Sequence, residues 1–267
     1  MVDLSGKTAL VTGSVQGIGL AIAEALAGAG ARIAVHGLAG DALSHEACAQ
    51  LEKAGAPEAS FFGGDLRDPD RIAELMAAVE AWGGADILVN NAGIQQTAPL
   101  AEMPRDLWDA ILAVNLSAAF HTMRAVMPMM AARGYGRVIN IASVHGLVAS
   151  ADKAPYVAAK HGLVGLTKVA ALEYAAAGDP ASGGVTANCI CPGWTETTLV
   201  EPQIAARARA AGGDRAAGVA ALLAEKQPSR RMSRPAEIGA LALWLCAPLA
   251  HNVTGAAIPV DGGWTAQ

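Results

Sequence analysis

Residues 7–19 read Lys-Thr-Ala-Leu-Val-Thr-Gly-Ser-Val-Gln-Gly-Ile-Gly, and they set the class of fold. The apolar, β-branched run over residues 7–12 predicts a buried parallel strand. Three glycines in the spacing Gly-x3-Gly-x-Gly follow it, and an apolar helical stretch continues to about Gly28. Glycines at a strand-to-helix turn let the backbone approach a pyrophosphate, and the helix N-terminus offers unpaired N–H groups. The turn therefore predicts dinucleotide binding by Gly13, Ser14, Gln16, Gly17, Ile18 and Gly19.

Strand and helix patterns alternate along the rest of the 267 residues, with no linker and no internal repeat. Strands are expected at residues 7–12, 31–36, 59–64, 86–90, 138–142, 185–190 and 255–260, and helices at 17–28, 41–54, 69–82, 105–133, 156–177, 198–227 and 234–246. The alternation predicts a Rossmann-type, doubly wound, seven-stranded parallel sheet with helices on both faces. We expect one domain over residues 1–267, with the Ala-rich, charged segment 198–227 as a helical lid and residues 178–184 as a loop.

Composition excludes several classes of protein. The net charge is −5 and no long Lys/Arg run occurs, so nucleic acid is not expected as a partner. The N-terminus does not read as a signal peptide, and no apolar run approaches ~20 residues, so a membrane span is not expected and the location is expected to be cytoplasmic. The four cysteines are expected to be reduced. Cys189 and Cys191 lack zinc spacing and nearby histidines, so no metal site is expected.

Ligands of such sheets bind at the carboxyl ends of the strands. Asp65 and Leu66 follow strand 59–64, where an adenine ring would lie. Asn91, Ala92 and Gly93 follow strand 86–90, and Pro192 and Gly193 follow strand 185–190. Short turns with little side chain suit a cofactor lying across the strand ends, although a simple strand-to-helix turn is the alternative for residues 91–93.

The end of strand 31–36 decides which dinucleotide is expected. An acidic residue there would bind the ribose 2′-hydroxyl, and a basic residue a 2′-phosphate. The chain has His36-Gly-Leu-Ala-Gly, with neither, and Val15 and Gln16 stand where the glycine turn could carry a basic residue. Arg32 lies too early in the strand and is expected at the surface. The cofactor predicted is NAD rather than NADP.

A second informative stretch runs over residues 143–160. Tyr156 and Lys160 are four residues apart on a predicted helix, so they share one face. A free Tyr titrates near ~10, and a neighbouring ammonium lowers that pKa, which would make the pair an acid/base. Ser143 follows an apolar strand, where its hydroxyl can bond the same reacting oxygen. Taken alone, Tyr-x-x-x-Lys is more often a chance surface pair than a functional one. Only the other motifs of the chain favour the functional interpretation.

Asn115 lies within the apolar stripe of the predicted helix 105–133. A buried amide is costly unless its polar atoms are satisfied. Asn115 is therefore either a satisfied core amide or a functional relay, and the sequence leaves both interpretations open.

With these residues assembled, the chain resembles the short-chain dehydrogenase/reductase family from Lys7 to Trp264. The motifs are the glycine turn, Asn-Asn-Ala-Gly at 90–93, Asn115, Ser143, Tyr-x3-Lys and Pro-Gly at 192–193. The resemblance implies a nicotinamide cofactor that Tyr156 and Lys160 also contact, a homotetramer, and a catalytic set of Asn115, Ser143, Tyr156 and Lys160. In this family the residue at Asn115 holds a water that relays protons to the lysine.

One branch of the family, which acts on D-3-hydroxybutyrate, is more similar still. The resemblance implies that Gln95, His145, Lys153 and Gln203 hold the substrate carboxylate beside Ser143 and Tyr156, while Trp194 and Trp264 wall the pocket. A cation, an imidazole and amides suit a small carboxylate in any case. Singly, each is as well explained as a solvated Lys or a capped His. The chain departs from the branch in a longer loop at 178–184 and a more polar stretch at 195–198.

The function predicted is the reversible, NAD-dependent oxidation of D-3-hydroxybutyrate to acetoacetate, with Tyr156 as general base. One alternative is an NAD(P)-dependent reductase of 3-oxoacyl or sugar substrates in the same family. A second alternative is a non-enzymatic regulator that binds NAD.

Overall fold

A sheet of seven strands in the order β3-β2-β1-β4-β5-β6-β7 forms the centre of the computed structural model, which describes residues 2–179 and 183–267. Each neighbouring pair is parallel. The strands are β1 Thr8–Val11, β2 Arg32–Gly37, β3 Ala59–Gly63, β4 Ile87–Asn90, β5 Tyr135–Ile141, β6 Gly184–Pro192 and β7 Ala257–Val260. The predicted doubly wound fold is confirmed.

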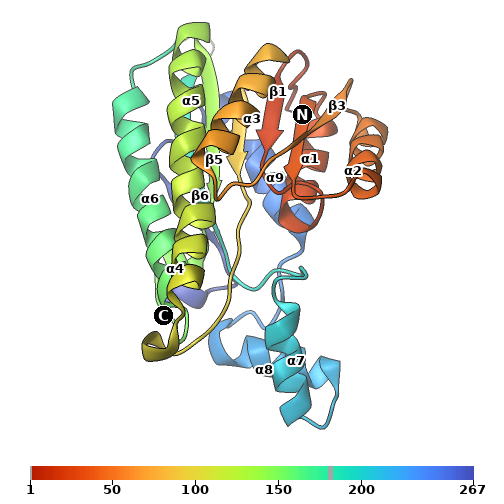
Figure 1. The fold of residues 1–267 in the computed structure, drawn as a ribbon, viewed down its shortest axis with the longest axis vertical. Coiled ribbons are helices and arrows are strands. Elements are labelled where there is room, and N and C mark those ends of the chain that lie inside the picture. The colour runs from red at the N-terminus through yellow and green to blue at the C-terminus, as the bar shows by residue number, and fades with distance from the viewer. Residues whose placement is uncertain (1, 180–182) are drawn as a thin grey trace.

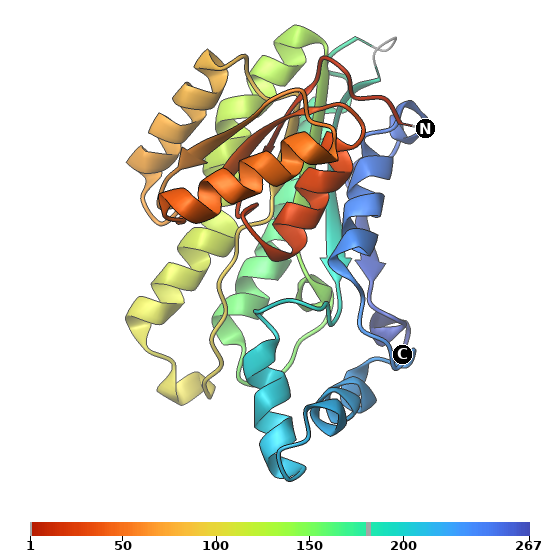
Figure 2. The same cartoon turned by 90° about the vertical axis from the view of Figure 1, so that its right-hand side faces the viewer.

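Helices cover both faces of this sheet (Figures 1 and 2). One face packs on α1 Gly17–Ala27, α2 Asp41–Ala54 and α9 Pro235–Leu245. The other packs on α3 Pro69–Ala81, α5 Ala118–Arg133 and α6 Ala154–Tyr174. Side chains of β1 alternate between the two cores, since Ala9 and Val11 enter the first and Leu10 the second. Strands buried on both faces explain the continuous apolar runs of the sequence.

The segment 105–133 differs from the single helix predicted for it. The chain forms α4 Arg105–Leu112, then a π-helical turn over Ala113–Ser117, then α5. A π turn holds one extra residue and often marks a functional position. Asn115, buried to 2% exposure, lies in the middle of this turn.

The same segment is long and apolar enough to cross a membrane, judged by length and composition only, with a mean hydropathy of 1.3. The expectation that no such stretch exists was therefore wrong. In the structure Met123, Val126, Met127 and Met130 of α5 are buried against the sheet. A helix packed in this way belongs to the core of a folded domain, and such helices pass the same test of length and composition.

The predicted lid is a pair of helices, α7 Glu201–Ala210 and α8 Arg215–Lys226, rather than one continuous segment. The pair stands apart from the two helical layers, at the bottom of Figure 1. Gly212 and Gly213 allow the turn between them, with φ of 75° and 96°. Ile204 and Leu222 join Trp194 and Trp264 in a separate apolar cluster. The loop predicted at 178–184 contains residues 180–182, which lie outside the described residues.

Candidate active site

A cavity of about 870 Å³ opens at the carboxyl ends of the strands and runs between the sheet and α7. It is lined by nearly every residue predicted from the sequence: Gly13, Gln16, Gly17, Ile18, Asp65, Leu66, Asn91, Ala92, Gly93, Gln95, Asn115, Ser143, His145, Lys153, Tyr156, Lys160, Pro192, Gly193, Trp194, Gln203 and Trp264. Segments far apart in the chain therefore meet in one space. Ser14 and Gly19, also predicted to bind cofactor, do not line the cavity and instead shape the turn.

The glycine turn fits a dinucleotide phosphate. Gly13 has a φ of +64°, and a Cβ on Gly19 would lie 2.3 Å from the Gly13 carbonyl oxygen, so side chains are excluded. Helix α1 begins at Gly17, and in the described structure no side chain caps it. Its first-turn N–H groups are thus open to an anion, and its dipole favours one.

Thr12 and Asn91 tie the glycine turn to the end of β4. The Thr12 hydroxyl oxygen accepts hydrogen bonds from the backbone N–H groups of Asn91 and Ala92 at 2.9 and 3.1 Å. The Asn91 side-chain amide donates to the carbonyls of Thr12 and Gly13 at 2.9 and 3.1 Å. The Asn-Ala-Gly stretch therefore braces the cofactor turn with its side chain while its backbone lines the cavity.

Ser143, Tyr156 and Lys160 come together as predicted, but their electrostatics differ from the prediction. Both Tyr156 and Lys160 lie on α6 and are buried, to 7% and 4% exposure. Burial raises the pKa of Tyr156 to about 12, and a hydrogen bond from Ser143 opposes that rise. Contrary to the expectation, Lys160 is not among the groups that shift the pKa of Tyr156 here, and its ammonium lies 5.6 Å from the ring centroid.

Lys160 instead donates to the Ile141 carbonyl at 2.7 Å, and burial lowers its pKa to about 8. The Asn115 side-chain amide donates to the carbonyls of Ile94 and Ile111, both at 2.9 Å. Its carbonyl oxygen is buried and has no hydrogen-bond partner among residues 2–179 and 183–267. Asn115 is thus only half satisfied, which leaves an acceptor for a further group.

The residues predicted to hold a carboxylate gather at the lid end of the cavity. Lys153 is buried to 5% exposure, donates to the Gln203 side-chain oxygen at 3.2 Å, and lies 4.9 Å from the Trp194 ring centroid. Burial, with the charge of Arg207, lowers the pKa of Lys153 to about 8. The Trp194 and Trp264 rings lie 5.3 Å apart. A buried cation beside two aromatic walls suits a small anion.

His145 is central to this end of the site. Its Nδ1 lies 3.3 Å from the Ser143 hydroxyl oxygen, and its Nε2 lies 3.0 Å from the Ser150 hydroxyl oxygen. Burial, with the charge of Lys153, lowers the pKa of His145 to about 3. The ring is therefore neutral at physiological pH. Sequence reasoning missed Ser150, because nothing in its type or position marks it as a partner of His145.

His36 and Arg67 were also missed. His36 lines the cavity, and its Nδ1 accepts a hydrogen bond from the Gly13 N–H. Arg67 lines the end of the cavity where the adenosine is expected, and its guanidinium pairs with Asp65 at 2.6 Å. A basic residue therefore does lie at this end, paired with a carboxylate.

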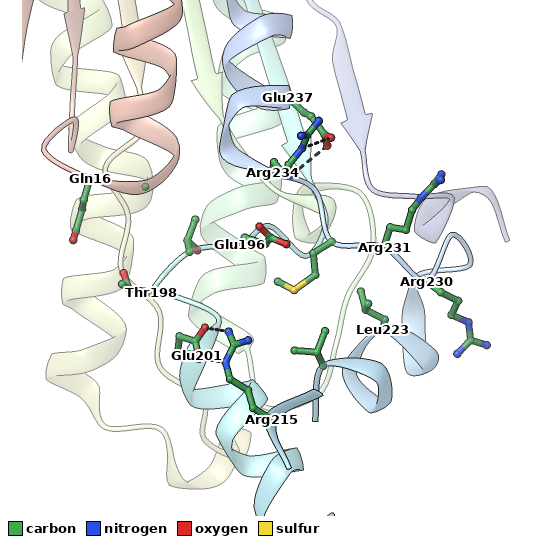
Figure 3. A pocket seen from close by; sticks show the side chains of 14 residues that line it. Gln16, Glu196, Thr198, Glu201, Arg215, Leu223, Arg230, Arg231, Arg234 and Glu237 are labelled. Carbon is green, nitrogen blue, oxygen red and sulfur yellow. Dashed lines mark hydrogen bonds and ion pairs between the residues drawn. The ribbon is translucent and has the colours of Figure 1, made fainter. Parts of the chain in front are cut away.

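A second pocket, of about 970 Å³, lies between the lid and α9 (Figure 3). Four of its charged side chains form two ion pairs, Arg234 with Glu237 at 3.2 Å and Arg215 with Glu201. Gln16 and Gly17 line both pockets, whereas none of Ser143, Tyr156 and Lys160 lines this one. It is therefore the space behind the lid rather than a place where the reacting groups meet.

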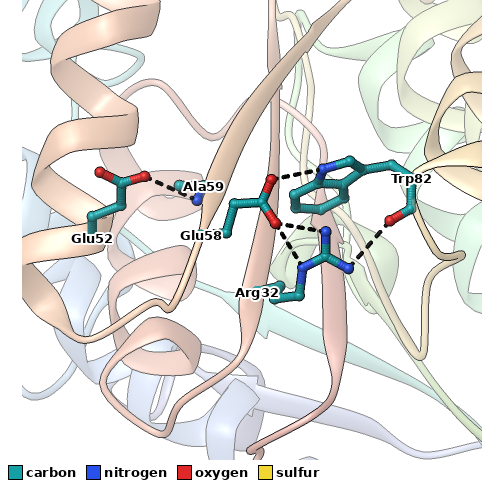
Figure 4. A network of polar contacts seen from close by, with 5 residues as sticks. All are labelled: Arg32, Glu52, Glu58, Ala59 and Trp82. Carbon is teal, nitrogen blue, oxygen red and sulfur yellow. Dashed lines mark hydrogen bonds and ion pairs between the residues drawn. The ribbon is translucent and has the colours of Figure 1, made fainter.

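Arg32 lies at the opposite end of β2 from the cavity, and it is half-buried rather than a free surface residue. Its guanidinium pairs with Glu58 at 2.7 Å, stacks on the Trp82 ring at 4.0 Å and donates to the Trp82 carbonyl (Figure 4). Arg32 thus links β2 to the residue before β3 and to the residue after α3. It takes no part in the choice of cofactor.

Three features together define a nucleotide-dependent oxidoreductase: the glycine turn, the open N-terminus of α1, and the buried set of Ser143, Tyr156 and Lys160. A family model described as short chain dehydrogenase matches residues 7–208. The chain belongs to the short-chain dehydrogenase family, whose members use a nicotinamide cofactor.

Relatives agree with this assignment. The chain is 51% identical over 266 residues to the D-beta-hydroxybutyrate dehydrogenase of Cupriavidus necator, covering 99% of this chain and 100% of that protein. A protein of the same name from Rhizobium meliloti is 45% identical over 262 residues, covering 98% and 99%. Among solved structures, L-sorbose reductase from Gluconobacter frateurii with NADPH and L-sorbose matches with a TM-score of 0.91 and 32% identity, covering 99% and 98%.

Proposed function

We propose that the protein oxidises D-3-hydroxybutyrate reversibly to acetoacetate with NAD. The observation that carries this proposal is the buried Lys153 ammonium, bonded to Gln203 in the cavity that also holds Ser143 and Tyr156. A buried cation without a carboxylate partner is costly, and a small substrate carboxylate would compensate it. The two relatives named D-beta-hydroxybutyrate dehydrogenase support the same substrate.

The roles of the chain's own residues follow from their positions. The glycine turn and the strand ends would hold NAD, which would supply the acceptor for the hydride of the carbinol carbon. Tyr156 removes the hydroxyl proton as the general base. Ser143 donates a hydrogen bond to the substrate oxygen and stabilises its developing charge. Lys160 supplies a cation beside Tyr156 and binds the nicotinamide ribose, while Asn115 offers its unpartnered oxygen to a relay water.

The residues at the lid end of the cavity orient the substrate. Lys153, Gln203, Gln95 and His145 bind the carboxylate, which fixes the carbinol carbon relative to the cofactor. The Trp194 and Trp264 side chains limit the length of the substrate. Gln203 lies on α7, so that closure of the lid over the substrate would bring its amide onto the carboxylate and exclude water.

The choice of NAD rests on the end of β2. Gly37, Leu38 and Ala39 line the cavity there without a basic side chain, and Arg67 is paired with Asp65. A 2′-phosphate would thus meet no free cation among these residues. We also infer a homotetramer, because α5 and α6 expose apolar side chains that further copies would cover: Phe120 at 45%, Val169 at 51% and Leu172 at 80%. The cytoplasmic location remains the expectation from the sequence.

A reductase of sugar or 3-oxoacyl substrates is the second candidate, favoured by the similarity to L-sorbose reductase. The buried Lys153 argues for a free carboxylate over a neutral sugar or a thioester. A non-enzymatic NAD-binding regulator is a third possibility, and the assembled Ser-Tyr-Lys set argues against it.

The test is formation of NADH from D-3-hydroxybutyrate, beside the L-enantiomer and with NADP in place of NAD. Turnover of the D form with NAD alone is expected. Activity with sugars or 3-oxoacyl thioesters but not with D-3-hydroxybutyrate would favour the reductase. Absence of any turnover, with NAD still bound, would favour the regulator.

A further inference from the structure

We propose that His36 is a positioning residue for cofactor binding, which holds the glycine turn in place only while its imidazole is neutral. The inference rests on the dinucleotide site of the family and not on the choice of substrate. His36 is the penultimate residue of β2, is buried to 2% exposure and lines the cofactor end of the cavity.

Four hydrogen bonds link residue 36 to its surroundings. The Gly13 N–H donates to the His36 Nδ1 at 3.3 Å, and the His36 Nε2 donates to the Gly64 carbonyl at 3.1 Å. The backbone of His36 donates to the Ser14 hydroxyl oxygen at 3.1 Å and accepts from the Ser14 N–H at 2.9 Å. The ring thus spans the gap between the glycine turn and the segment after β3.

These partners leave the ring one tautomer. A backbone N–H can only donate and a backbone carbonyl can only accept, so Nδ1 must be bare and Nε2 must carry the proton. A second proton on Nδ1 would oppose the Gly13 N–H and remove its acceptor. The turn is not free to move away instead, because the Asn91 side-chain amide holds the carbonyls of Thr12 and Gly13.

The surroundings of His36 favour its neutral form. The glycine turn at residues 13–17 and β3 carry no charged side chain. The other adjoining segments carry charged or titratable groups: Arg32 on β2, Asp65 and Arg67 after Gly64, Asp41, His45, Glu46, Glu52 and Lys53 on α2, and Asp70, Arg71, Glu74 and Glu80 on α3. Arg32, Arg67 and Arg71 are each paired, with Glu58, Asp65 and Glu74. Burial lowers the pKa of His36 below its usual value.

The experiment compares the NADH dissociation constant at about pH 7.5 and about pH 4.5, the second about two units below the ordinary histidine pKa of ~6.5 because burial lowers the pKa of His36. Wild-type affinity is expected to weaken severalfold at the lower pH. In His36→Asn the side-chain oxygen can take the place of Nδ1 but cannot titrate, so that variant should bind NADH normally and lose the pH dependence. His36→Leu, which keeps neither partner, should weaken binding by roughly tenfold at both pH values.

Controls separate this effect from folding and from catalysis. His36→Gln reaches the Gly64 carbonyl but not the Gly13 N–H, so it should resemble His36→Leu even if the latter fails to fold. His161→Asn, at an exposed position on α6, should retain the wild-type pH dependence. The proposal is overturned if His36→Asn loses affinity at low pH as the wild type does, or if His36→Gln binds NADH as tightly as His36→Asn. Because the readout is cofactor binding, a wrong substrate assignment would leave the result interpretable.

Discussion

A single hydroxyl, that of Tyr156, is expected to carry the proton transfer. Tyr156→Phe should lower kcat by at least ~100-fold, the usual contribution of a general base, and leave the NADH dissociation constant nearly unchanged. Since burial raises the pKa of Tyr156 to about 12, oxidation by the wild type should speed up toward alkaline pH. Steady-state rates and NADH titrations of both proteins measure these effects. Normal turnover by the Phe variant would remove Tyr156 from the mechanism.

The buried ammonium of Lys153 makes a different prediction. Lys153→Met keeps the length and apolar packing of the stem and removes the charge. We expect KM for D-3-hydroxybutyrate to rise by roughly 10- to 100-fold, as for a charge-assisted hydrogen bond, with a smaller change in kcat. Lys168→Met, at an exposed position of α6, the helix that begins directly after Lys153, is the matched control. An unchanged KM would contradict the carboxylate site.

At the level of residues, the sequence predicted which side chains meet but not their protonation. Tyr156 and Lys160 share a helix face by spacing alone, and Ser143 by its place after a strand. The pKa shifts depend on burial, and the contacts of His36 depend on Gly13 and Gly64. Those two residues approach the imidazole only when three strands are side by side. Such facts have no local signal in a single sequence.

The π turn over Ala113–Ser117 is the element that sequence periodicity could not predict. Apolar spacing is nearly the same for a continuous helix and for one that holds a single extra residue. The turn directs the Asn115 amide at the Ile94 and Ile111 carbonyls. That contact with Ile94 comes from a segment outside the helix, and helical periodicity carries no information on it.

Asn115→Leu tests how much the Asn115 side chain in the π turn contributes to the free energy of unfolding. The variant leaves the Ile94 carbonyl without its donor, so we expect the free energy of unfolding to fall by about 1–3 kcal/mol. Urea denaturation measures the change, with Asn252→Leu at an exposed position as the control. If stability were unaffected, the half-satisfied amide would not support the turn. A loss of activity larger than the loss of stability explains would support the relay role proposed for Asn115.

For the whole molecule, burial of neutral histidines predicts a loss of stability in acid. His36 and His145 both have folded pKa values below the unfolded value of ~6.5, and that of His145 is about 3. The unfolded chain therefore binds more protons below about pH 6.5, so stability is complete above that pH and declines as pH falls. We expect roughly 1.4 kcal/mol per pH unit from His145 until its folded pKa of about 3 is approached, and a further contribution of the same sign from His36.

Urea denaturation over a series of pH values measures this decline. The variants His36→Asn and His145→Asn should each flatten the curve, whereas His121→Asn, on the less buried side of α5, should not. A wild-type curve that is flat between about pH 6.5 and about pH 4 would contradict the assignment of neutral buried rings.

The global fold was the part most open to prediction, because alternation of strands and helices fixes a parallel sheet and its handed crossovers. The lid was less so. The alanines and charged residues along 198–227 predict helix. The break at Gly212 and Gly213, however, divides the segment into two helices that fold back on each other. Its packing on Trp194 and Trp264 depends on residues from three distant segments.

The strand order implies a sequence of events during folding. β1 lies between β2, which follows closely, and β4, which comes only after β3 has been added on the far side. The Thr8 N–H and its Asp86 acceptor are 78 residues apart, so closing that pair costs more chain entropy than any step before it. Thr12 and Asn91 meet in the same closure. A newly made chain thus gains its nucleotide-binding site only when β4 pairs with β1. The time at which NADH binding first appears in a refolding experiment would be the time of that pairing.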